Sequence, residues 1–98
     1  MTTIKKLTAL PYAHAHVEIS EDGTITLFSY VTKVAEIDSD GFLTVYGLYS
    51  MTTRKHISAF VREYTPFDYQ GAKACYEDNY KINIYTGEVI SLVAGEEE

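Results

Sequence analysis

The sequence predicts an α+β protein, in which an antiparallel sheet of four to five strands carries two consecutive helices packed on one face. Three observations indicate this class: apolar residues alternate in the first half of the chain, their spacing changes to that of a helix between about residues 52 and 78, and alternation returns after residue 80. Consecutive strands joined by tight turns pair antiparallel. Two helices placed late in the chain then cover one sheet face.

The first half of the chain reads as strands and turns. Alternation predicts strands at 13–19, 24–37 and 42–49, with turns at 21–23 and 38–41. Gly23 makes the first turn a hairpin signal, because glycine tolerates the positive φ that such turns need. Apolar residues change parity within 24–37, and we expect a bulge or bend near Thr32 to reset the register.

The helical spacing predicts two helices. In the first, Ser50, Thr52 or Thr53 caps the start and Pro66 ends it, because proline lacks the amide hydrogen that a helix interior requires. Its apolar stripe is Ile57, Phe60, Val61 and Tyr64. The second runs from about Asp68 to Asp78, and Asn79 suits the left-handed position after it. Its stripe is Tyr69, Ala72, Cys75 and Tyr76.

The end of the chain predicts a strand at 80–85 and a short last strand at 89–93. Residues 1–93 then form a single domain, and 94–98 form an acidic flexible tail. The length of 98 residues allows one domain. No apolar run is long enough for a membrane helix or a signal peptide, so we expect a cytoplasmic protein.

Composition excludes several classes of protein. The single cysteine, Cys75, excludes an internal disulfide and a multi-cysteine zinc site, and its place on an apolar stripe favours a buried thiol over a nucleophile. His14, His16 and Glu18 share one strand face, but without a visible fourth ligand they predict a solvated face and no metal. No catalytic motif is present, so we expect no enzyme and no cofactor.

Charge is the most informative feature. The net charge is −6, and residues 18–40 and residues 68–98 each carry −5. An acidic surface attracts basic partners and repels nucleic acid and membranes, which disfavours direct nucleic-acid binding. The predicted anionic contacts to a basic protein surface are Asp38, Asp40, Glu77 and Asp78, with Tyr80 and Tyr85 as aromatic anchors. Their fields would add if the 38–41 turn lay beside an end of the second helix.

A basic cluster at the start of the first helix supports an alternative. A helix N-terminus binds anions through its free amides and its dipole. The alternative is therefore a nucleic-acid- or anion-binding accessory protein, with a site made by Ser50, Thr52, Thr53, Arg54, Lys55 and Arg62. The blander interpretations are a capped helix with an exposed basic turn, and an acidic surface that serves solubility alone. A homodimer is left open.

The stretch Tyr49-Ser-Met-Thr-Thr-Arg-Lys-His-Ile57 and the stretch Asp68-Tyr-Gln-Gly-Ala-Lys73 resemble short proteins of unknown function from bacteriophages and mobile elements of gut Firmicutes. The resemblance covers roughly residues 27–90 and leaves out the hairpin with His14 and His16. It implies a phage setting, where small acidic proteins often inhibit host machines. The first functional hypothesis is therefore a binding module without catalysis that inhibits or modulates a host protein, including an anti-CRISPR-like action on a defence nuclease by nucleic-acid mimicry.

Overall fold

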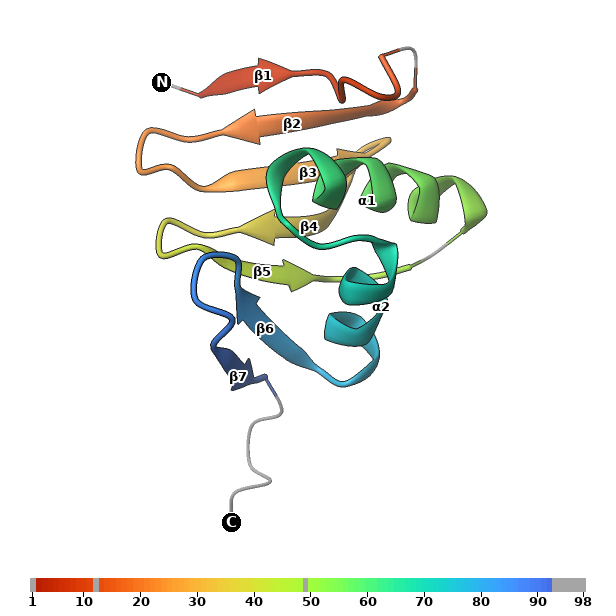
Figure 1. The fold of residues 1–98 in the computed structure, drawn as a ribbon. Coiled ribbons are helices and arrows are strands. Elements are labelled where there is room, and N and C mark those ends of the chain that lie inside the picture. Colours follow the sequence, from red (N-terminus) through yellow and green to blue (C-terminus); the bar gives the residue numbers. More distant parts are fainter. Residues whose placement is uncertain (1, 12, 49, 93–98) are drawn as a thin grey trace.

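The computed structural model describes residues 2–11, 13–48 and 50–92. The elements are β1 (Thr3–Lys5), β2 (Ala15–Ile19), β3 (Ile25–Ser29), β4 (Thr32–Ile37), β5 (Phe42–Val45), α1 (Met51–Tyr64), α2 (Tyr69–Glu77), β6 (Tyr80–Asn83) and β7 (Val89–Ser91). All seven strands form one antiparallel sheet in sequence order, and both helices cover the same face of it (Figure 1). The α+β class is confirmed. The predicted number of four to five strands is wrong.

Two features account for the additional strands. β1 is a three-residue edge strand paired to β2. The run predicted as one strand over 24–37 is two strands, β3 and β4, because the chain reverses at Tyr30 and Val31. Tyr30 has a φ of 57°, a conformation that hairpin turns often need and that glycine usually supplies. Because a tyrosine occupies this position, the sequence contains no glycine that would indicate the turn.

The change of parity predicted near Thr32 is present as a bulge. Leu27 pairs with Ala35 while Phe28 pairs with Lys33, so Val34 is the extra residue on β4. Val34 and Ala35 are consequently both fully buried, although strand neighbours normally face opposite sides. The bulge and the turn at Tyr30 together produce the parity change that the sequence displays.

The helices begin and end close to the predicted positions. Ser50 caps α1 and Asp68 caps α2, each by accepting a backbone amide hydrogen bond on its side chain. Asn79 follows α2 with a φ of 55°, as predicted. Tyr76, predicted on the apolar stripe of α2, is instead exposed. Neither helix has the length and apolar character of a membrane-spanning segment, among the residues that the structure describes.

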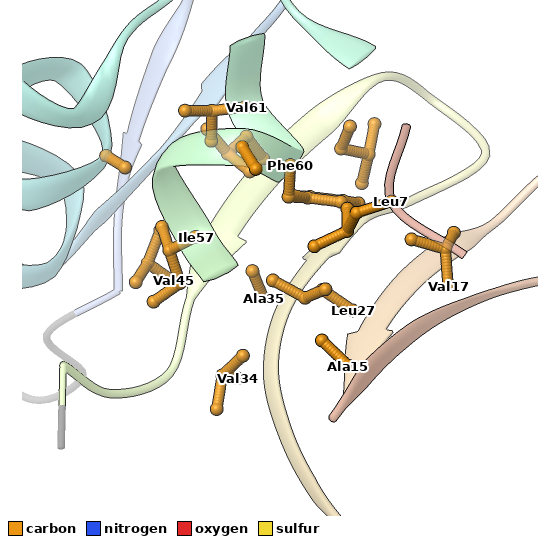
Figure 2. Packing of buried hydrophobic residues seen from close by; sticks show 14 of the residues in the cluster. Leu7, Ala15, Val17, Leu27, Val34, Ala35, Val45, Ile57, Phe60 and Val61 are labelled. Atoms are coloured by element: carbon orange, nitrogen blue, oxygen red, sulfur yellow. The ribbon is translucent and has the colours of Figure 1, made fainter. Parts of the chain in front are cut away.

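The core lies between the sheet and the helices. Ile57, Phe60 and Val61 of α1 are fully buried, and they pack over Leu27 and other apolar residues of the sheet (Figure 2). Leu7, from the connection between β1 and β2, is fully buried in the same cluster. This leucine holds the connection close to α1. The predicted tail at 94–98 and Tyr49 lie outside the described residues.

Candidate functional site

The sheet topology gathers acidic turns at one end of the molecule. When antiparallel strands follow one another in space as in sequence, successive turns alternate between the two ends of the sheet. The β2–β3, β4–β5 and β6–β7 turns therefore lie at the same end (Figure 1). We call this end the acidic turn surface, and its carboxylates are Glu21, Asp22, Asp38, Asp40 and Glu88.

Two of these carboxylates also hold their turns together. Asp38 accepts hydrogen bonds from the backbone amides of Asp40 at 2.9 Å and Phe42 at 3.0 Å. Its other oxygen lies 3.9 Å from the ammonium of Lys81. A hydrogen bond from the Ser20 hydroxyl, aided by the Thr24 amide, holds the pKa of Asp22 below its usual range. The main role of Asp38 is therefore to stabilise its turn, whereas Asp40 is the exposed carboxylate of the same turn.

Tyr85 is the exposed aromatic residue of the acidic turn surface. Its side chain is 81% exposed, yet its ring lies against the backbone of Gly41: a Cβ placed on that glycine would come within 2.7 Å of the ring. The Ile84 amide donates to the Gly41 carbonyl at 2.8 Å, and the Asn83 side chain donates to the Asp40 carbonyl at 3.0 Å. These contacts hold Tyr85 close to Asp40.

Glu77 and Asp78 lie elsewhere. Asp78 caps the C-terminus of α2, at the end where β6 begins, whereas the 38–41 turn meets the end where β6 finishes. The length of β6 therefore separates Glu77 and Asp78 from the 38–41 turn, so the condition under which the fields of the two acidic pairs would add is not met. Tyr80 is partly buried against the core, next to Cys75, so it presents less surface to a partner than Tyr85 does.

The predicted helix-start site is divided by the fold. The Ser50 side chain accepts the Thr53 amide hydrogen bond at 3.1 Å and so serves as the helix cap, whereas the Thr53 side chain is buried. Thr52 is exposed. Arg54 donates from Nε to the Leu48 carbonyl at 3.4 Å. Arg54, Lys55 and Arg62 all lie on the solvent side of α1.

A buried polar cluster under α1 was not expected from the sequence. The Ser29 hydroxyl lies 2.8 Å from Nδ1 of His56 and 3.4 Å from the Thr53 hydroxyl. Burial lowers the pKa of His56, and nearby His14 lowers it further. Serine beside histidine resembles a nucleophile and its base. Both side chains are almost fully buried, however, which leaves no room for a substrate at the hydroxyl.

His16 of the predicted solvated face has partners within the protein. Nε2 of His16 lies 3.0 Å from the Glu18 carboxylate, and the His16 ring stacks on Phe28 with ring centroids 5.0 Å apart. Within the described ranges, histidine, cysteine and acidic side chains form no cluster of three or more that could hold a metal ion.

Comparison with known proteins places the chain in a family. No curated protein and no solved structure matches it. Residues 2–80 match a family of unknown function, DUF8033. The match extends over both helices and also over the first hairpin, which lay outside the resemblance noted from the sequence. Because it covers most of the 98 residues, the chain belongs to this family of unknown function.

Proposed function

We propose that the protein is a binding module without catalysis, which inhibits or modulates a partner protein by placing its acidic turn surface on a basic surface of that partner. The observation that carries the proposal is the convergence of three hairpin turns, with their carboxylates, at one end of the sheet. Clustered charge of one sign raises the association rate with an oppositely charged surface. In a phage setting, a nucleic-acid-binding host enzyme such as a defence nuclease offers such a surface.

The acidic turn surface also has the chemistry of an interface centre. Tyrosine is enriched among the residues that dominate binding energy, because it offers a large contact area and a polar tip. Tyr85 is exposed, is backed by Gly41 and lies close to Asp40. The hydrogen bonds between the two turns hold this arrangement in place before any partner arrives, which lowers the entropy cost of binding.

The test begins with tagged protein used to capture partners from a bacterial lysate, followed by binding measurements on the recovered partner. The variant Asp40→Asn/Glu88→Gln removes two exposed charges from the acidic turn surface. We expect binding at low salt to weaken by about tenfold, with a reduced salt dependence. Tyr85→Ala should raise the dissociation rate, since a central anchor acts after encounter.

The matched control is Glu77→Gln/Asp78→Asn, which removes the same charge at the opposite end of β6. This control should bind as the wild type does. Equal losses in the two double variants would mean that net charge alone matters. An unchanged affinity in the Asp40 and Glu88 variant would refute the acidic turn surface as the binding site.

A further inference from the structure

The solvent side of α1 forms one wall of a groove whose chemistry is opposite to that of the acidic turn surface. The groove has a volume of about 500 Å³ and lies between α1 and the connection that leads from β1 to β2. Its apolar part is lined by Ala9, Leu10 and Ala59. Lys55 and Arg62 also line it, and they lie two helical turns apart on the same side of α1.

A second groove continues from the first across α1 towards α2. It has a volume of about 310 Å³, and it shares Lys55 and Ser58 with the first groove. Arg54 and Lys73 add two further cations to its lining. The two grooves therefore make one band across both helices, and this band holds four of the eight lysines and arginines of the chain. We call it the basic groove.

The positive charge of the basic groove is not neutralised from within the described residues. Among the described residues, no carboxylate lies within ion-pair distance of Lys55, Arg62 or Lys73. Glu63 is the acidic residue of the lining. Both of its carboxylate oxygens are engaged by Thr8, through the backbone amide at 2.9 Å and the hydroxyl at 2.8 Å. Glu63 thus fastens the β1–β2 connection to α1 while the cations remain available.

Tyr69 completes the lining of the second groove. The Tyr69 side chain lines the second groove beside Lys73, and its hydroxyl oxygen is buried. Among the described residues it has no hydrogen-bond partner. A buried hydroxyl without a partner costs free energy. Because this oxygen is buried, it offers no contact to a ligand that lies in the groove.

We propose that the basic groove docks an acidic segment of a partner protein. An apolar side chain of that segment rests on Ala9, Leu10 and Ala59, and its flanking carboxylates meet Lys55 and Arg62 on one side and Lys73 on the other. Such a segment complements the groove in two ways, because the groove offers an apolar lining for its apolar side chain and unpaired cations for its carboxylates. An amphipathic peptide laid into a groove uses the same combination.

A nucleic acid fits these observations less well. Its affinity comes mainly from phosphate contacts, and each contact needs a cation. The protein carries a net charge of −6, which repels a long polyanion. The grooves show a single aromatic residue, Tyr69, on which a base could stack, and an apolar lining gains nothing from a sugar–phosphate backbone. Nucleic acid is therefore kept as an outcome of the test.

The experiment titrates isotopically labelled full-length protein with a short peptide in which one leucine is flanked by glutamates, observed by amide chemical shifts. We expect the shifts to map to residues 8–10, the solvent side of α1 and the start of α2. The variant Lys55→Gln/Arg62→Gln should weaken binding by about tenfold or more. Tyr69→Phe should bind the peptide as the wild type does, because the buried hydroxyl offers the groove no contact.

The matched control is Lys33→Gln/Lys81→Gln, which removes the same charge from the sheet face that the helices leave uncovered. It should bind the peptide as the wild type does. Equal binding of a peptide with glutamine in place of glutamate would overturn the proposal, as would a loss in the control equal to that in the groove variant. Binding of a short single-stranded DNA without binding of the acidic peptide would also overturn it. Apart from Lys81 in the control, these variants leave the acidic turn surface unchanged. This test and the test of the proposed function can therefore fail independently of each other.

Discussion

Lowering the pH should destabilise the fold through one buried histidine, His56. Its side chain is 2% exposed, and Nδ1 lies 2.8 Å from the Ser29 hydroxyl. The Tyr30 ring is tilted relative to the His56 ring, and the centroids of these two rings lie 6.2 Å apart. Burial lowers the pKa of His56 from its ordinary value of 6.5, because a charged imidazole loses hydration there. The unfolded chain keeps the ordinary pKa and therefore binds a proton more readily.

The sign and size of the effect follow from proton linkage. Above pH 6.5 the histidine is neutral in both states, and its effect on stability is absent. As the pH falls below 6.5, His56 binds a proton in the unfolded state but not in the folded state, so the free energy of unfolding decreases. One proton gives a slope of at most about 1.4 kcal/mol per pH unit. Against a typical stability of roughly 5–15 kcal/mol, such a loss is readily measured.

The assay is urea unfolding followed by circular dichroism, at a series of values between about pH 7.5 and pH 5.5, where unfolded carboxylates are still ionised. We expect stability to fall with pH in the wild type and to fall less steeply in His56→Gln, whatever the absolute stability of that variant. An equal slope in His56→Gln and in the wild type, or a wild type of equal stability at both pH limits, would refute the assignment.

Two further predictions concern the core. Phe60 is fully buried and its ring packs on Tyr64, so Phe60→Ala should lower the free energy of unfolding by about 3–5 kcal/mol; an unmoved denaturation midpoint would contradict the packing. Burial raises the pKa of the Cys75 thiol to about 11, so a thiol reagent at neutral pH should modify it only in denaturant; rapid labelling of the folded protein would contradict its burial.

The helices could be predicted from the sequence because their signals are local. A cap residue, a 3.6-residue apolar spacing and a terminating proline all lie within one short segment. Ser50 and Asp68 cap as predicted, and Ile57, Phe60 and Val61 are buried as predicted. The same holds for the Gly23 turn, where glycine marks the positive φ. In each case the residue that determines the structure is within a few positions of the structure it determines.

The strand count could not be predicted, because its causes are long-range. β3 and β4 can pair with each other as separate strands only if Tyr30 adopts a positive φ. No local feature of the sequence indicates that a tyrosine will do so. β1 is three exposed residues long, too short for alternation to be visible, and it is defined only by its pairing with β2. A strand is completed by a neighbour distant in sequence, so its existence depends on the whole sheet.

The sequence by itself determined the charge of each segment and the class of the fold, but the tertiary structure decided which charges lie together. The alternation of turns in an antiparallel sheet separates Asp40 from Glu77 and Asp78, although all three belong to acidic segments. It brings Asp40 towards Tyr85, far along the chain. The basic groove likewise forms only where the connection after β1 folds against α1, because Leu7 is buried in the core beneath them. Composition is a property of the chain, whereas a surface is created by the pairing of strands and the burial of apolar side chains.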